Sequence, residues 1–297
     1  VAERNIGGDN VPVVIAARLD GDLTTDPQFV PDYIYTGRQL PATPQKGVQY
    51  IVDADVWEGK PDTWPAFKGD QLPFVSSSNA ALKFLFITYM GLNDEALACL
   101  KYHPEIVLIV QSNHPNRLGE QRALVHQLMQ EGLSNPVVFF QHYAEEEKED
   151  LQIKAAADMG ALVFDGLTDG IFLYNQGSIP ATTLDATAFG ILQAGRLRTS
   201  KTEYISCPGC GRTLYDLQST IARIKAATSH LKGLKIGIMG CIVNGPGEMA
   251  DADYGYVGAG RGKISLYKKK ECIEKNIPEE EAVEKLIELI KANGDWQ

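Results

Sequence analysis

Long apolar runs and an excess of basic residues are both absent from this sequence of 297 residues. No window approaches the roughly 18 consecutive apolar residues of a membrane-spanning helix, so we expect no membrane partner. Lysine and arginine number 28, against 38 aspartates and glutamates, which gives a formal net charge of −10. Because nucleic-acid binding requires clustered positive charge, this balance argues against a general nucleic-acid-binding protein.

Cysteine is also scarce. The five cysteines are an odd number, and the first ten residues, "VAERNIGGDN", lack both a signal-peptide pattern and an initiator methionine. We therefore expect no disulfide framework, a reducing compartment and a piece of a longer chain. In such a compartment, closely spaced cysteines indicate metal or redox chemistry. Cys99 lies at helix spacing among apolar residues and Cys272 lies in a short strand-like run, and we interpret both as small buried hydrophobic side chains.

Apolar segments recur from residue 11 to about residue 175 and predict buried parallel strands. Helical patterns at 94–101, 118–131 and 144–159 separate the later ones, and such alternation indicates an α/β fold. An irregular barrel is our first choice and an open doubly wound sheet the second, because the first three segments have little helix between them. The eight predicted strands are VPVVIAAR, DYIYTG, VQYIVDAD, LKFLFITYM, EIVLIVQS, NPVVFFQHY, ALVFDG and IFLYN.

The last hundred residues have a different pattern. We predict a helix at 186–197 and then a domain boundary near Thr199, which gives a barrel-like domain at 1–199 and a small α+β domain at 200–297. In the second domain we expect a helix at about 214–231, a strand in "LKIGIMG", two strands in "YGYVGAGRGKISLYKK" and a final helix that begins at Pro278.

Three cysteines and a glutamate lie on two turns rich in glycine and proline. Their spacing is Cys-x2-Cys-x30-Cys-x6-Glu, and the second turn also carries an asparagine, Asn244, in the stretch "NGPG". Glycine and proline favour turns that point several side chains to one side. We therefore expect these residues to converge on one site, formed by Cys207, Cys210, Cys241 and Glu248.

Three kinds of site fit this pattern to different degrees. Structural zinc usually takes four Cys or His ligands, and here only His230, on the predicted helix, could be the fourth. A dithiol redox pair would use Cys207 and Cys210 alone. Three thiolates favour an iron–sulfur cluster. A carboxylate is a harder ligand than a thiolate, so Glu248 could be exchanged for an oxygen of a substrate.

The segments "CPGCGRTLYDLQ", "MGCIVNGPGE" and "YGYVGAGRGKISLY" resemble the cluster-binding signatures and following hairpin of the (E)-4-hydroxy-3-methylbut-2-enyl diphosphate synthase family. "PVVIAARLDGDLTTDPQFVPDYIYTGR" and "RLRTSKTEYISCP" resemble the three-domain, plant-like branch. The resemblance implies that an N-terminal catalytic TIM barrel is missing here. It also implies a degenerate, TIM-barrel-like inserted domain with a spacing role, followed by a small α+β iron–sulfur domain.

That family acts as an oxidoreductase in the non-mevalonate isoprenoid pathway. The resemblance implies reductive opening of 2-C-methyl-D-erythritol 2,4-cyclodiphosphate to the linear diphosphate, with ferredoxin or flavodoxin as electron donor. It implies a 4Fe–4S cluster anchored by Cys207, Cys210 and Cys241, with Glu248 on the exchangeable iron. Asn244 would contact the bound intermediate or serve only as a turn residue.

The segment "ALVFDGLTDGIFLYNQG" resembles a phosphate-binding strand of the family's first barrel, but apolar Phe172 and Leu173 stand where the resemblance implies a polar clamp. Because the acidic chain offers no set of basic residues for a cyclic diphosphate, we expect it alone to be catalytically inactive. The location would be the cytoplasm of a bacterium or the plastid stroma of a plant. Two other classes remain open from the residues: a non-catalytic, zinc-stabilised binding module and an electron-transfer iron–sulfur protein.

Overall fold

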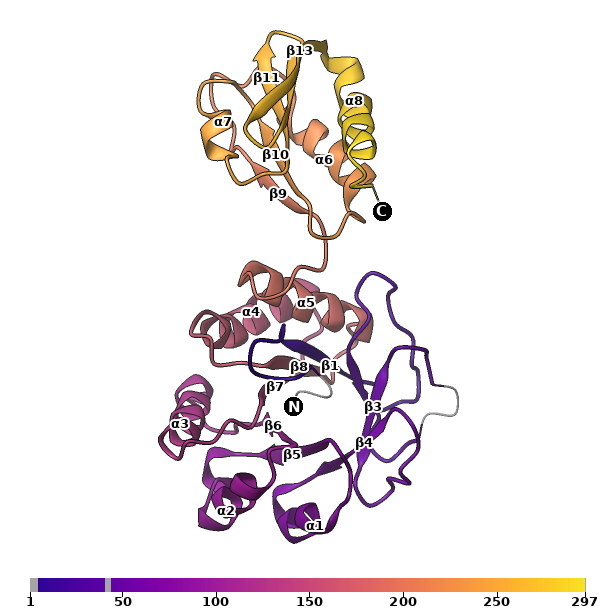
Figure 1. Ribbon diagram of the computed structural model, residues 1–297, viewed down its shortest axis with the longest axis vertical. Helices are drawn as coiled ribbons and strands as arrows, with labels where there is room; N and C mark the ends of the chain where they lie inside the picture. Colours follow the sequence, from indigo (N-terminus) through magenta and orange to yellow (C-terminus); the bar gives the residue numbers. More distant parts are fainter. Residues whose placement is uncertain (1–4, 41–43, 297) are drawn as a thin grey trace. The chain divides into compact units, whose positions relative to one another are not determined.

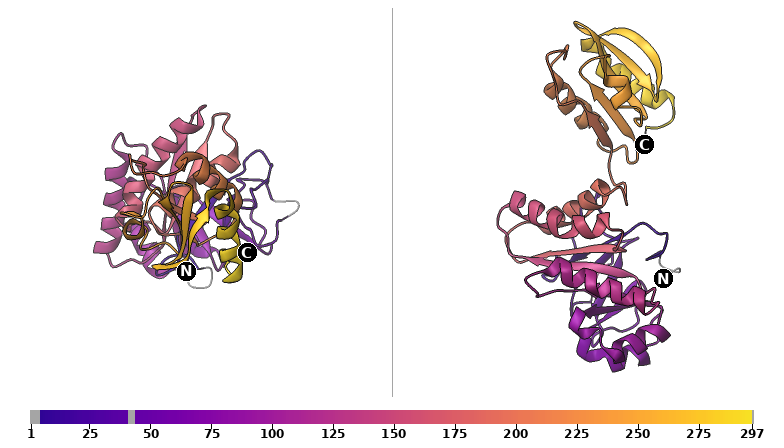
Figure 2. Two further views of the ribbon diagram at one scale, coloured as in Figure 1. Left: turned by 90° about the horizontal axis from the view of Figure 1, so that it is seen from above. Right: turned by 90° about the vertical axis from the view of Figure 1, so that its left-hand side faces the viewer.

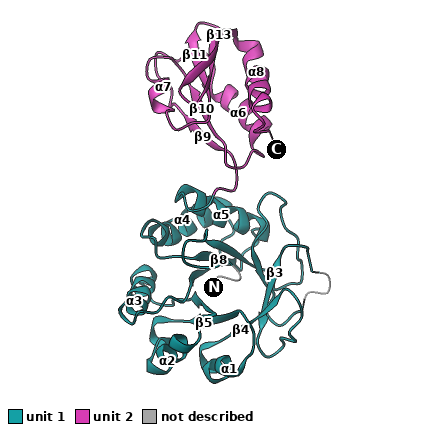
Figure 3. Cartoon of the chain, viewed as in Figure 1, with its two compact units in different colours: residues 1–198 teal, residues 199–297 magenta. Residues whose placement is uncertain are grey.

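The computed structural model describes residues 5–40 and 44–296. The chain divides into two compact units, Val1–Arg198 and Thr199–Gln297 (Figure 3). Within the described ranges, no helix has both the length and the apolar character needed to cross a bilayer.

Unit 1 is a closed barrel of eight parallel strands (Figure 1). Every neighbouring pair is parallel, and the last strand pairs with the first, Val13 lying opposite Gly170. The predicted irregular barrel is therefore confirmed, and the open sheet is wrong. The strands are β1 (Val13–Ala17), β2 (Tyr33–Tyr35), β3 (Gln49–Asp53), β4 (Thr63–Phe67), β5 (Lys83–Ile87), β6 (Ile106–Val110), β7 (Val137–Tyr143) and β8 (Gly170–Asn175).

Helices cover only part of this barrel. The described parts of the connections between β1 and β4 contain no α-helix, whereas an α-helix follows each strand from β4 to β8 (Figure 2). The sequence pattern predicted the longer of these helices but not the shortest one, at residues 72–77. The helices are α1 (Leu72–Ser77), α2 (Asp94–Tyr102), α3 (Arg117–Gln130), α4 (Lys148–Phe164) and α5 (Ala181–Ala194).

One of the eight strand predictions is wrong, and one strand was missed. The segment "ALVFDG" is not a strand, because residues 161–164 form the last turn of α4 and the rest forms the turn after it. The true fourth strand is β4, "TWPAF", in which Pro65 lies opposite Val52 of β3. Proline lacks the N–H that a strand interior normally donates, so the sequence pattern pointed away from a strand here.

Several predicted helix starts are shifted. Helix α4 begins at Lys148 rather than at 144, so its acidic first turn consists of Glu149 and Asp150. Helix α5 begins five residues before the predicted start, after Pro180. The helix predicted from 214 begins at Leu217, because the Asp216 side chain accepts a hydrogen bond from the Ser219 N–H and caps it there.

Aromatic side chains close the bore of the barrel. Tyr35, Phe86, Phe140 and Phe172 form a layer of rings whose centroids lie 4.9–6.5 Å apart. Phe172 is buried in this layer, whereas Leu173, its neighbour on β8, points outward and packs between the strands and the helices. Side chains alternate in this way along a strand, and the barrel is consequently a packed core without a channel.

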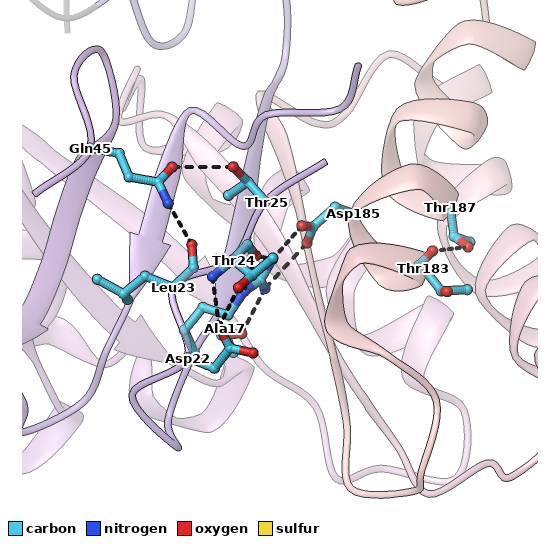
Figure 4. Close-up of polar contacts among 10 residues, drawn as sticks. Ala17, Asp22, Leu23, Thr24, Thr25, Gln45, Thr183, Asp185 and Thr187 are labelled. Carbon is cyan, nitrogen blue, oxygen red and sulfur yellow. Dashed lines mark hydrogen bonds and ion pairs between the residues drawn. The ribbon is translucent and has the colours of Figure 1, made fainter. Parts of the chain in front are cut away.

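A buried ion pair lies at the carboxyl end of β1. Arg18 Nη2 lies 2.5 Å from Asp185 Oδ2 of α5, and the two side chains are only 3% and 2% exposed. The guanidinium also donates to the carbonyl oxygens of Ala17 and Thr24 (Figure 4). All three nitrogens of this buried guanidinium therefore donate to oxygen acceptors, as a buried charge requires.

Helix α3 buries a glutamine whose side chain has no hydrogen-bond partner. Gln121 is 1% exposed, and neither Oε1 nor Nε2 finds a partner among the described residues. We expect Gln121→Met to raise the free energy of unfolding by about 1 kcal/mol or more, because an unsatisfied buried amide is removed at similar volume and helix propensity. Chemical denaturation measures this change. Exposed Gln130, on the same helix, is the matched control: if Gln130→Met stabilises the protein equally, burial of the amide is not the cause.

Unit 2 is a five-stranded mixed sheet in the order β13-β12-β11-β10-β9. Helices α6 (Leu217–Thr228) and α8 (Glu279–Ala292) share one apolar core with the sheet, while the short helix α7 (Gly245–Glu248) lies on the other face (Figure 1). The small α+β fold is confirmed, as is a final helix after Pro278. The strands are β9 (Glu203–Ser206), β10 (Lys235–Met239), β11 (Tyr254–Gly260), β12 (Lys263–Lys268) and β13 (Glu271–Pro278).

Candidate functional site

Both cysteine-bearing turns begin at the same edge of the sheet in unit 2. Strands β9 and β10 are parallel neighbours, and Ser206 lies opposite Ile238. Cys207 follows β9 directly, and Cys241 follows β10 after a single glycine. Because parallel neighbours end at one edge, segments about thirty residues apart in sequence emerge side by side. Open α/β sheets commonly bind ligands at such an edge.

The Cys-x-x-Cys turn directs peptide N–H groups at its sulfurs. Gly209 N–H donates to Cys207 Sγ over 3.3 Å, and Arg212 N–H donates to Cys210 Sγ over 3.4 Å. Gly209 has φ +84°, a conformation that favours glycine. The Arg212 N–H, followed by its guanidinium, lowers the pKa of the Cys210 thiol. The surroundings of Cys210 thus stabilise the thiolate needed for metal binding.

Hydrogen bonds hold the first turn against the end of β10. Cys207 N–H donates to Ile238 O over 3.2 Å, and Leu214 N–H donates to Gly240 O over 3.2 Å. The Tyr215 hydroxyl adds a bond to Met239 O over 3.0 Å. The position of Cys207 relative to the second turn is therefore fixed by backbone contacts, independent of any bound group.

The second turn is braced by α7. The Asn244 carbonyl accepts from the N–H groups of Gly247 and Glu248 over 3.1 and 3.0 Å. Gly245, at the start of α7, is buried and so close to the Met239 side chain that a Cβ would lie 2.7 Å from it. Glu248 itself is exposed, so its carboxylate is available to a ligand.

The predicted residues line one cavity. Its volume is about 130 Å³, and its lining includes all three cysteines of the motif, Asn244, Glu248 and Arg212. Cys241 is buried and Cys210 exposed, so the cavity reaches from the core to the surface. Arg212 places a positive charge among groups that are negative when ionised. Thr213 and Tyr215, which brace the turn, were not singled out from the sequence, because hydroxyl side chains after a turn carry no distinctive signal.

These side chains surround a cavity but do not converge on a position that could hold a single metal ion. Among residues 5–40 and 44–296, no three Cys, His, Asp or Glu side chains are arranged to hold a single metal ion. A tetrahedral zinc ion needs four ligands at about 2.0–2.3 Å, whereas a cubane of four irons is larger and has its ligands farther apart. Three thiolate donors, two of which receive peptide N–H bonds, and one carboxylate line a shared cavity, and this donor set fits such a cluster.

The remaining candidates lie elsewhere. The ring of His230 packs edge-on against Trp296 at 5.0 Å, and His230 is not part of the cavity lining. Cys99 on α2 and Cys272 on β13 are half-buried and pack against apolar clusters. Neither cysteine contributes to the cavity.

A family profile described as "GcpE protein C-terminal domain" matches residues 203–292, which include both turns. These residues are therefore similar to that domain. The cavity at the ends of β9 and β10 lies within the matched segment, and the resemblance seen in the cysteine motifs has support beyond the motifs themselves.

Three relatives carry the name "4-hydroxy-3-methylbut-2-en-1-yl diphosphate synthase (flavodoxin)". The protein of Bacteroides fragilis is 75% identical over 294 residues, or 99% of this chain and 47% of the relative. That of Bacteroides thetaiotaomicron is 76% identical over 290 residues, or 98% and 47%. That of Chlorobaculum tepidum is 52% identical over 191 residues, or 64% and 25%. The chain spans about half the length of the first two.

Proposed function

We propose that this chain is the iron–sulfur part of a 4-hydroxy-3-methylbut-2-enyl diphosphate synthase. The enzyme would reductively open 2-C-methyl-D-erythritol 2,4-cyclodiphosphate. The observation that carries the proposal is the single cavity shared by Cys207, Cys210, Cys241 and Glu248. The printed names of relatives up to 76% identical support it.

In this proposal the three thiolates hold a 4Fe–4S cluster, which would supply electrons to the substrate. Peptide N–H groups of Gly209 and Arg212 stabilise the sulfur charge. Glu248, on an exposed turn, would be the fourth ligand, and its carboxylate, a harder ligand than a thiolate, would be the one suited to exchange with a substrate oxygen. Asn244, at the rim of the cavity, orients the substrate that enters it. The Arg212 guanidinium offsets negative charge in the cavity.

The other parts of the proposal concern the whole enzyme. Unit 1 would be an inserted barrel with a spacing role, as in the plant-like branch, and a catalytic barrel upstream would bind the cyclic diphosphate. Flavodoxin is the donor that the relatives' names suggest, with ferredoxin as the alternative. Because the relatives are bacterial, we propose the bacterial cytoplasm as the location.

Anaerobic loading of the chain with iron and sulfide tests the cluster. We expect about four irons and four sulfides per chain, as a 4Fe–4S cluster requires, and an EPR signal after reduction. With reductant and the cyclodiphosphate, the loaded chain should form no linear product, because the aromatic layer leaves no polar substrate pocket in the bore. Tight binding of zinc without uptake of iron and sulfide would favour the zinc-stabilised module. Robust turnover would place the substrate site in this chain.

A further inference from the structure

A second cavity opens at the carboxyl ends of β6, β7 and β8 in unit 1. Its volume is about 610 Å³, and it lies beside the aromatic layer, with Phe140 in its wall. Because that layer fills the bore, a ligand here would stay at the mouth of the barrel. This is the end at which barrels of this type carry their binding sites.

The charge of this cavity is unusual for so acidic a chain. Its lining contains Arg117, His142 and several amide side chains, but no aspartate or glutamate among the residues described. The neighbouring cavity beside β1 differs, because Asp20, Asp22 and the buried Arg18–Asp185 pair line it. Of these two cavities, the one at β6–β8 therefore favours an anion. The acidic group nearest in the hydrogen-bond network is Glu120, which accepts from the Ser112 hydroxyl at the rim.

Two donors in this cavity point to a ligand. Arg117 Nη1 donates to Gln141 Oε1 over 3.1 Å, which fixes the orientation of that amide. Gln141 is only 2% exposed, yet its Nε2 has no partner in the described part of the chain. Arg117 likewise forms no ion pair with any described carboxylate. Because Gln141 Nε2 is not among the buried atoms that lack a partner and Arg117 is exposed, both donors are accessible and remain available to an acceptor on a ligand.

We propose that Arg117 and Gln141 bind the phosphoryl group of a small phosphate ester at the mouth of the inserted barrel, a role beyond the cluster function. A guanidinium offers two parallel N–H bonds to phosphate oxygens, and the Gln141 amide adds a third donor. The stacked rings of His142 and Tyr174, 5.3 Å apart at the same rim, form a flat surface for the rest of the ligand. A single phosphoryl group suits a site with one guanidinium, that of Arg117, better than a diphosphate with its larger negative charge does.

Titration calorimetry with inorganic phosphate, in a low-salt buffer without other oxyanions, tests the site. We expect saturable binding by the whole chain and about tenfold or greater weakening in Arg117→Gln, because a charge-assisted contact is lost. Gln141→Leu, on a different element, should also weaken binding. Arg122→Gln is the matched control, because Arg122 lies on the same helix but pairs with Asp165.

The outcomes separate the possibilities. A methyl phosphate ester should bind with the same dependence on Arg117, whereas acetate should bind more weakly. Absence of saturable binding, or an equal loss in Arg122→Gln, would overturn the proposal, as would acetate binding as strong as that of phosphate. Melting curves establish that each variant is folded. If Arg117→Gln does not fold, undiminished binding by folded Gln141→Leu overturns the assignment.

Discussion

Replacement of Cys241 by alanine is expected to abolish iron–sulfur binding. Cys241 is the buried ligand candidate, at the inner end of the cavity, and its loss leaves two thiolates, both from one turn. Iron and sulfide content, together with the visible absorption of the anaerobically loaded protein, measure the effect. Cys272→Ala is the matched control, because that cysteine lies on β13 and outside the cavity.

The contrasting change is Glu248→Cys. A fourth thiolate should preserve or strengthen retention of the cluster, and in a full-length synthase it should lower turnover, because a thiolate is harder for a substrate oxygen to displace. Full iron content in Cys241→Ala would contradict the proposed ligand set. Unchanged turnover of Glu248→Cys would contradict ligand exchange while leaving the set intact.

Replacement of Arg18 by methionine is expected to cost about 3–5 kcal/mol of stability in unit 1 at pH 7, because Asp185 becomes an unpaired buried charge. Burial already raises the pKa of Asp185 to about 6, and Arg18 opposes that rise. Without Arg18 the pKa should rise further. Chemical denaturation monitored at pH 7 and pH 5 measures both effects.

The sign of the pH effect follows from proton binding. Between the unfolded pKa of aspartate, about 4, and the raised folded pKa, the folded chain binds more protons than the unfolded chain. Stability therefore falls as pH rises through this window, and the window is wider in Arg18→Met. The deficit relative to wild type should shrink from pH 7 to pH 5.

Two controls isolate the buried charge. Arg38→Met breaks the exposed pair with Asp55 and should cost at most about 1 kcal/mol. The double change Arg18→Met with Asp185→Leu should recover much of the loss, because no unpaired charge remains. A double variant no more stable than Arg18→Met would show that packing, not charge, sets the cost.

Local signals predicted much of the fold because they depend on neighbours in sequence. Apolar runs such as "EIVLIVQS" became β6, and the helix predicted from residue 94 begins at Asp94 as α2. The errors arose where tertiary contacts overrode the local pattern. Pro65 lies within β4, opposite Val52 of β3, and residues 161–164 of "ALVFDG" are helical, with Leu162 and Val163 in the core of unit 1.

The sequence by itself determined the cysteine turns of unit 2. Spacing, glycine and proline limit the conformations available near Cys207 and Cys210, and the six residues between Cys241 and Glu248 cannot separate these two side chains widely. Only the tertiary structure decided that β9 and β10 are neighbours, which brings Cys241 to that turn. It likewise paired Arg18 with Asp185, 167 positions apart, and left the Gln141 amide beside Arg117 without an acceptor. Such pairings depend on which strands adjoin and which atoms remain buried, and these are properties of the closed barrel and the sheet as wholes.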